Sequence, residues 1–314
     1  MKNKFLILLF ILLGNVAYGQ TKSISQDELL FEKGILLQNS LRDELELNEI
    51  ISENDSASEK SILAREINES ILEIAWDYYQ ELIDSFPNSK LYYRALNNRA
   101  FIELQTDDKE GAKATFLEIL NSNADDKEKG GLGSGLMAEP NANYKNRATN
   151  ILARLAYDEK DYKEALKYLD LNKKYPYQHF CGNAHASNRI YMSTMYAKCY
   201  IGLNQLDKAY EQLFPNIIEN GLADNSELVE LTYSTLLKNY NKKELKRLYA
   251  EAFKNYEVVK SKKKKDFKED YYITFLGTRI KLRSWRLAFL DEDKKEKAIN
   301  AMYENSKFYK LLNE

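Results

Sequence analysis

The chain has 314 residues, with 46 lysines and arginines against 48 aspartates and glutamates, and its formal net charge of -2 gives no electrostatic reason to expect binding to nucleic acid or to an anionic membrane. Hydrophobic residues at 44% and charged residues at 30% are typical of a folded protein, and the scarcity of glycine (12) and proline (4) predicts long helices with few turns. With 2 histidines in the sequence, a His-dependent hydrolase or a multi-histidine metal enzyme is hard to assemble.

The N-terminus is typical of a secretory signal peptide. Two lysines precede an apolar run over residues 5–13, and small residues stand at Ala17 and Gly19, the two positions that signal peptidase recognises. We therefore expect residues 1–19 to be removed, because the apolar run is much shorter than the ~20 residues that a membrane-spanning helix needs. The predicted location is an oxidising compartment, the periplasm first and the extracellular space as the alternative, with no integral membrane segment in the mature chain.

Two helical segments are expected next. Residues 20–56 contain an amphipathic pattern over 26–51, which predicts a helix that caps the N-terminal end of the fold. Ser56 and Glu59 have the spacing of a capping box, so a helix should begin there. Either one long helix or a bent pair of helices should follow as far as residue 85.

Small residues recur at a fixed separation between residues 57 and 220. In three successive segments, an alanine is followed by a second alanine twelve positions later, and one further alanine occupies the second position of an earlier unit. Two antiparallel helices joined by a short turn approach most closely where both present a small side chain, so this spacing predicts helix pairs packed through alanine. The predicted packing residues are Ala75, Ala100, Ala112, Ala153, Ala165, Ala197 and Ala209.

This pattern resembles the tetratricopeptide repeat (TPR), a helix pair of about 34 residues with small residues at its eighth and twentieth positions. The segment Tyr79 to Ser89 further resembles repeats of bacterial periplasmic scaffold proteins. The consensus tryptophan is absent from each first helix, so the repeats are divergent. The resemblance implies an all-α fold, a tetratricopeptide-like α-solenoid of antiparallel helix pairs with helical caps. An unrelated helical bundle with chance alanines is the alternative.

The resemblance also implies a function, that of an exported scaffold that binds a protein or peptide partner through a concave surface. In the resembled family that surface is built mainly from the first helix of each pair. Arginines recur along the predicted surface and suit the carboxylates of a bound segment, although each is also an ordinary solvent-facing helix former. These tentative partner-binding residues are Arg94, Arg99, Arg147, Arg154 and Arg189.

The alternative function is that of a carbohydrate- or cell-wall-binding accessory protein, which would use some of the 23 tyrosines in the groove. We expect no enzymatic activity, no catalytic residue, no cofactor and no metal. The identity of a protein or peptide partner stays open, and nucleic acid is not expected as one.

Two loops are predicted to interrupt the repeats, at residues 121–143 and 175–187. The first is rich in glycine, but no Lys-Ser or Lys-Thr follows its glycines, so it is not expected to bind phosphate. It is either a mobile connector or a loop whose apolar residues dock on a partner or on the solenoid itself.

All histidines and cysteines of the chain lie in the second loop or just after it, at His179, Cys181, His185 and Cys199. In an oxidising compartment, Cys181 and Cys199 are predicted to form a disulfide that closes a loop of about 19 residues. A Cys2His2 zinc site built from all four residues is one alternative, and two unpaired thiols are the other.

The C-terminal part departs from the alanine pattern. Residues 221–259 predict a degenerate helical pair, and residues 260–270, with their run of lysines, predict a charged linker. The final segment, 271–314, is expected to cap the solenoid. Within it, β-branched and aromatic residues over 271–282 predict either a short β-hairpin or the start of a buried helix, and periodicity alone does not decide between them.

Overall fold

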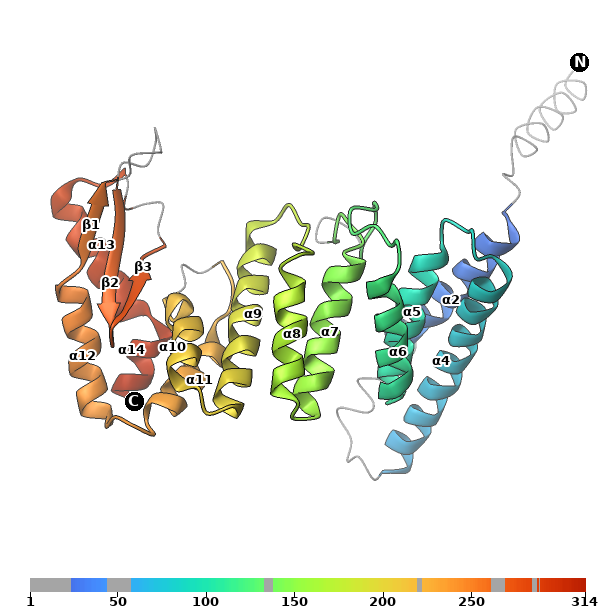
Figure 1. Ribbon diagram of the computed structural model, residues 1–314, viewed down its shortest axis with the longest axis horizontal. Helices are drawn as coiled ribbons and strands as arrows, with labels where there is room; N and C mark the ends of the chain where they lie inside the picture. Colours follow the sequence, from blue (N-terminus) through green and yellow to red (C-terminus); the bar gives the residue numbers. More distant parts are fainter. Residues whose placement is uncertain are drawn as a thin grey trace, which may run out of the picture. The chain divides into compact units, whose positions relative to one another are not determined.

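The structure is a computed structural model that describes residues 24–43, 58–132, 138–218, 222–260, 269–283, 287 and 289–314. The predicted signal peptide, residues 1–19, lies outside the described residues, as does the tip of the glycine-rich loop at 133–137. The chain divides into two compact units, Met1–Thr115 (unit 1) and Phe116–Glu314 (unit 2). Among the described residues the structure is mainly α-helical, as predicted, with one small antiparallel sheet (Figure 1).

The described residues of unit 1 form helices and short turns, with no strand among them. Helix α2 packs against α4, and α4 packs against α5. The bounds are α2 Gln26–Asp43, α4 Glu59–Ser85, α5 Tyr92–Gln105, and α6 Lys109–Asn121, which continues into unit 2. Helix α4 is one long helix rather than a bent pair, and its N-cap is Ser58, whose hydroxyl accepts a hydrogen bond from Ser61 N at 3.2 Å. The predicted cap, Ser56, lies outside the described residues.

Unit 2 continues with two further helix pairs, in which α7 packs on α8, α9 packs on α10, and α8 packs on α9 (Figure 1). The bounds are α7 Tyr144–Asp158, α8 Tyr162–Asn172, α9 Gly182–Gly202 and α10 Leu206–Leu213. Because α9 already begins at Gly182, the loop predicted for residues 175–187 was wrong in its second half, which is helical.

The alanines predicted to pack between helices are buried. All seven have an exposed fraction of 0%. The turn inside each pair is also repeated, since Asp107, Lys160 and Asn204 have φ values of 60°, 63° and 56°. Each of these left-handed residues lies seven positions after the first alanine of its pair. Alanine packing and turn geometry therefore recur together at one fixed register.

The C-terminal part of unit 2 combines helices with a sheet in the order β1-β2-β3. The bounds are η2 Phe214–Asn216, α11 Ser226–Leu236, α12 Lys242–Lys254, β1 Glu257–Lys260, β2 Glu269–Phe275, β3 Thr278–Lys281, α13 Glu292–Asn305 and α14 Lys307–Asn313. Aromatic side chains from helices and sheet meet in its core, where the ring of Tyr249 lies 5.0 Å from that of Phe308 and 5.3 Å from that of Phe275.

The predicted β-hairpin is confirmed as β2 and β3, with Ile273 paired to Ile280. Its turn residues Leu276 and Gly277 both have positive φ, at 47° and 78°, as a two-residue turn matching the twist of the strands requires. The prediction for the preceding residues was wrong. Helix α12 ends at Lys254, and residues 257–260 pair with β2 as a third strand instead of extending the helix.

The predicted linker at 260–270 was wrong at both ends, since Lys260 pairs with Glu269 across β1 and β2. The adjacent β-branched residues Val258 and Val259 are the local reason for a strand here. Residues 261–268, which hold most of the lysine run, lie outside the described residues.

Candidate functional site

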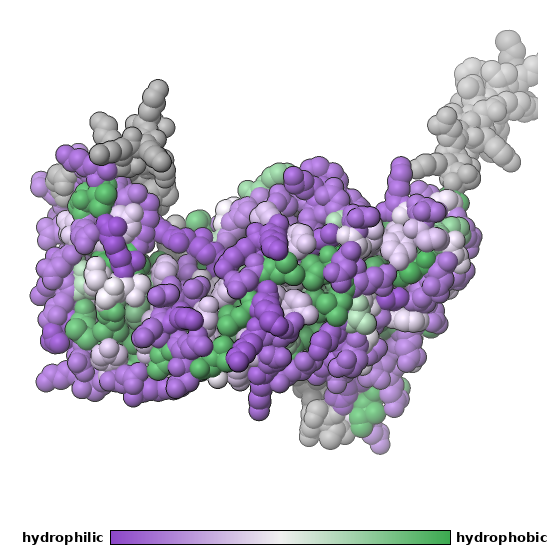
Figure 2. Space-filling model, in the orientation of Figure 1, coloured by the Kyte–Doolittle hydropathy of each residue, from purple (hydrophilic) through white to green (hydrophobic). Residues whose placement is uncertain are grey.

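A cavity of about 540 Å³ lies in unit 2 between the start of α7, the start of α9 and the loops that precede these helices. Hydrophobic residues are visible at the surface over α7, α8 and α9, between hydrophilic ones (Figure 2). The cavity is lined by Glu139, Asn143, Asn146, Arg147, Asn150, Tyr177, His179, Cys181, Asn183, Ala184, Ser187, Asn188 and Tyr191.

The glycine-rich loop is closed at its base and leads directly into the cavity wall. Lys129 forms an isolated β-bridge with Asn141, and Gly130 N donates to the main-chain oxygen of Pro140 at 3.1 Å. The carboxylate of Asp126 accepts hydrogen bonds from Lys145 N at 2.6 Å and Asn146 N at 3.1 Å, which ties the loop to the first turn of α7. The described ends of this loop are therefore anchored, which does not fit a mobile connector at its base.

Asn143 joins the two loops that border the cavity. It has a left-handed φ of 52° immediately before α7. Its Oδ1 accepts from Gln178 N at 2.8 Å, and its Nδ2 donates to the main-chain oxygen of Gln178 at 3.1 Å. One buried carboxamide thus satisfies both main-chain groups of Gln178 and fixes the loop before α9 against the start of α7.

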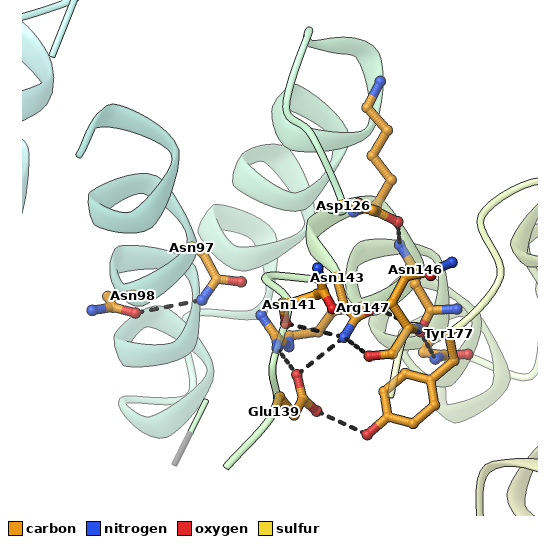
Figure 3. A network of polar contacts seen from close by, with 12 residues as sticks. Asn97, Asn98, Asp126, Glu139, Asn141, Asn143, Asn146, Arg147 and Tyr177 are labelled. Atoms are coloured by element: carbon orange, nitrogen blue, oxygen red, sulfur yellow. Dashed lines mark hydrogen bonds and ion pairs between the residues drawn. The ribbon is translucent and has the colours of Figure 1, made fainter. Parts of the chain in front are cut away.

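Glu139 and Arg147 form the charged part of the cavity, and their side chains and the phenol of Tyr177 point toward one another (Figure 3). Arg147 Nη2 lies 2.7 Å from Glu139 Oε2, and the exposed side-chain fractions are 11% and 21%. The Tyr177 hydroxyl donates to Glu139 Oε1 at 3.2 Å, and Asn143 Nδ2 lies 3.4 Å from Oε2. Both carboxylate oxygens are thereby engaged inside the chain, and the full charges of Glu139 and Arg147 offset each other.

The pKa shifts around the cavity follow burial. Burial lowers the pKa of the Arg147 guanidinium, and the carboxylate of Glu139 opposes that shift. Burial, together with the negative charge of Glu139, raises the pKa of Tyr177 to about 12, so this phenol stays protonated and keeps donating at neutral pH. Burial also raises the pKa of Asp126, although its two main-chain donors act in the opposite direction.

One buried acceptor in the cavity wall has no partner among the described residues. Asn150 Nδ2 donates to Asn146 Oδ1 at 3.3 Å, but Asn150 Oδ1 is buried and receives no hydrogen bond there. The carboxamide of Asn146 is itself fixed, since its Nδ2 donates to the main-chain oxygen of Tyr175 at 2.6 Å. Reversing Asn150 would deprive Asn146 Oδ1 of its donor. An unsatisfied buried acceptor costs about 1–3 kcal/mol.

The opposite wall is the start of α9. Ala184, Asn188 and Tyr191 are spaced three or four residues apart, so they lie on one face of the helix. Tyr191 is 38% exposed, and Phe180, in the loop before α9, is 82% exposed. The cavity lining therefore pairs polar groups with the partly exposed ring of Tyr191, and the exposed Phe180 stands between the lining residues His179 and Cys181 in the sequence.

The predicted disulfide between Cys181 and Cys199 was wrong, because both thiols are free. Cys181 is the N-cap of α9, while Cys199 lies near the other end of the same helix. Eighteen positions along a helix are roughly 27 Å, whereas a disulfide needs Cα atoms within about 7 Å. Burial raises the pKa of Cys199 to about 11, so that thiol stays protonated.

The alternative zinc site is excluded by the same distance, since it needs both cysteines. The two imidazoles are also engaged locally: His179 Nδ1 accepts from Cys181 N at 2.9 Å, and His185 Nε2 donates to the main-chain oxygen of His179 at 2.8 Å. Within the described ranges, no group of three or more histidine, cysteine, aspartate or glutamate side chains is placed to hold a metal ion.

The five arginines expected on one surface have different environments. Arg147 lines the cavity. Arg99, in unit 1, is 13% exposed and contacts Glu103, Gln80 and Thr115, so it serves an internal network. Arg189 Nε donates to Asn216 Oδ1 at 3.0 Å. A partner-binding role stays a prediction for Arg94, which is half-buried, Arg154, which is exposed, and Arg189.

Neither Glu139 nor any asparagine of the cavity lining was predicted as a site residue from the sequence. A signal was present, because Asn143, Asn146 and Asn150 recur at intervals of three and four and so share one face of α7. Nothing in the sequence indicated that Glu139 and Tyr177, 38 positions apart, meet.

Across the described helices, none is both long and apolar enough to cross a membrane. Comparisons of the chain with protein-family models, with curated proteins and with solved structures found no match.

Proposed function

We propose that this protein is a divergent TPR-like helical-repeat protein that recognises an extended segment of a protein partner in the cavity between α7 and α9. Two features support the repeat assignment: the seven fully buried alanines, and the left-handed turn residue found seven positions after the first alanine of three helix pairs. In the resembled family the first helices of successive pairs form the recognition surface, and α7 and α9 are each the first helix of a packed pair.

The observation that carries the proposal is the cavity itself, with the unpartnered acceptor Asn150 Oδ1 in its wall. Polar residues follow α7 at one-turn intervals from Asn143 to Arg154, a rise of about 16 Å. An extended chain of about five residues covers that length. The exposed ring of Phe180, near the cavity in sequence, is of the kind that anchors protein interfaces.

We further propose that the chain is exported and acts in the periplasm without catalysing a reaction. The apolar leader with Ala17 and Gly19 supports export. N-terminal sequencing of the protein recovered from a periplasmic fraction tests this part, and a mature start at Gln20 is the expected result. An intact Met1 in the cytosolic fraction would contradict it.

A selection from random linear peptides displayed on phage tests the binding function. The bait is the mature chain, compared with Asn150→Leu, which replaces the unpartnered acceptor by an apolar group of similar size. The control is Lys167→Ala on α8, whose side chain is 74% exposed and lies outside the cavity lining. We expect the parent and the control to enrich the same peptides, and Asn150→Leu to lose them while keeping the parent's far-UV circular dichroism.

A saccharide is the second candidate ligand, favoured by the carboxamides of the cavity and by the partly exposed ring of Tyr191. An immobilised glycan array probed with the same three proteins separates the two candidates. Binding to a glycan that Asn150→Leu abolishes, with no peptide enriched by the parent, would replace the peptide by a saccharide. Equal behaviour of all three proteins on both supports would refute this cavity as the binding site.

A further inference from the structure

We infer that Glu139 sets the charge preference of the cavity. Glu139 forms an ion pair with Arg147 inside the chain. The site therefore selects a partner segment that is uncharged and forms hydrogen bonds, and it rejects an acidic segment. This inference rests on the proposed function, and it reverses the expectation that Arg147 pairs with a carboxylate of the partner. It makes Glu139 a specificity-determining residue.

The Glu139 carboxylate is held in a fixed position beside Arg147. It reaches Arg147 from the segment that precedes α7, at 2.7 Å, and both side chains are largely buried. Tyr177 and Asn143 hold it in place from two other directions. A carboxylate of a bound segment that approached Arg147 would therefore meet a fixed negative charge at close range, and in a partly buried site that repulsion is weakly screened.

The rest of the cavity lining favours a ligand that donates hydrogen bonds. Asn150 Oδ1 has no hydrogen-bond partner among the described residues, and an ionised carboxylate could not supply one because it has no proton to donate. His179 accepts at Nδ1 from Cys181 N, so that nitrogen carries no proton. The other polar groups in the lining are carboxamides and hydroxyls, including Asn188 and Ser187. Two separate features, a fixed carboxylate and an orphaned acceptor, thus disfavour acidic ligands and favour amide or hydroxyl donors.

The test changes the charge of the site in both directions. Glu139→Gln keeps the size of the side chain and removes the carboxylate that faces Arg147. Arg147→Gln does the opposite and leaves the Glu139 carboxylate without that arginine. Glu164→Gln on α8 is the matched control, since it removes the same formal charge from an exposed ion pair with Lys167 that lies outside the cavity lining.

The probe is the same random phage-displayed peptide pool, with the residue types in the enriched peptides counted by sequencing. We expect the parent and Glu164→Gln to favour asparagine and glutamine over aspartate and glutamate. Glu139→Gln should shift that ratio toward the acidic residues by about tenfold or more, and Arg147→Gln should enrich lysine and arginine by a similar factor. Far-UV circular dichroism checks the fold, and the second charge variant carries the test if the first does not fold.

The outcomes separate the two proposals. Peptides enriched by the parent, with ratios unchanged in both charge variants, would overturn the role of Glu139 and leave the peptide-binding function standing. No peptide enriched by the parent over the uncoated support would overturn the function, and this inference with it.

Discussion

Replacing Glu103 by alanine should destabilise unit 1 strongly, although the residue forms what looks in sequence like an ordinary i,i+4 ion pair on α5. Its Oε1 lies 3.2 Å from Arg99 Nε and also accepts from Trp76 Nε1 at 3.1 Å. Its Oε2 accepts from Thr115 Oγ1 at 2.8 Å. The exposed side-chain fractions of Arg99 and Glu103 are 13% and 7%, so the carboxylate is the centre of a largely buried network.

The expected loss follows from that burial. Removing one partner of a buried ion pair costs about 3–5 kcal/mol, because the other charge is left without its counter-ion in a poorly solvated site. The indole N–H of Trp76 and the hydroxyl of Thr115 lose their acceptor as well, and these costs overlap rather than add. We therefore expect Glu103→Ala to lower the free energy of unfolding of unit 1 by about 3–5 kcal/mol.

The matched control is Glu251→Ala on α12. Arg247 and Glu251 are also an i,i+4 pair, but their side chains are 59% and 49% exposed. Exposed pairs of this kind contribute about 0.3–0.5 kcal/mol, and the higher helix propensity of alanine offsets part of that loss. The free energy of unfolding should therefore change little.

Urea unfolding measures both variants, followed by tryptophan fluorescence for Glu103→Ala in unit 1 and by far-UV circular dichroism for Glu251→Ala in unit 2. Tryptophan fluorescence reports unit 1 when Trp285, the other tryptophan of the chain, is replaced by phenylalanine, because Trp76 belongs to the network. Losses of less than about 1 kcal/mol for both variants would refute the argument, since burial would then make no difference to an Arg–Glu pair of identical spacing.

Three further predictions concern individual side chains. Intact-mass analysis should find two free thiols, with Cys181 reacting with a disulfide reagent in the folded protein and Cys199 only after unfolding; a disulfide-linked mass would contradict the structure. Ala197→Leu should lower the free energy of unfolding by about 1–3 kcal/mol in urea, because the alanine is fully buried, and a variant as stable as the parent would mean that the helices separate easily. The hydrogen bond from Lys295 lowers the pKa of Glu269, so the stability that this pair contributes is present above the unfolded pKa of Glu269 and is lost as the pH falls through its folded pKa. Lys295→Met should therefore weaken the loss of stability in acid, and parallel pH profiles for variant and parent would argue against this pair.

Local patterns in the sequence were enough to predict the helix pairs, whereas for residues 271–282 they left a β-hairpin and a helix start both open. The twelve-residue alanine spacing places two small side chains across a short turn, and the alanines are buried because helix periodicity and turn length are properties of the nearby chain. The pairing of β2 with β3 across a turn with Gly277 decided for the hairpin.

Predictions that depended on the spatial distance between residues far apart in the sequence were wrong or were not made. The disulfide followed from compartment and loop length, but the start of α9 at Gly182 put Cys181 and Cys199 on one helix and so kept them apart. Strand β1 forms by pairing with the edge of β2, and a pattern of four residues does not predict which strand they pair with.

The cavity could not be predicted from the sequence for the same reason. Its defining contacts, Asn143 with Gln178 and Glu139 with Tyr177, join residues 35 and 38 positions apart. Nearby residues were sufficient for the helix pairs, because the two alanines of each pair are twelve positions apart across one short turn. The meeting of Glu139 with Arg147 and Tyr177 was decided by the tertiary structure, since it depends on how two loops and two helices pack around them.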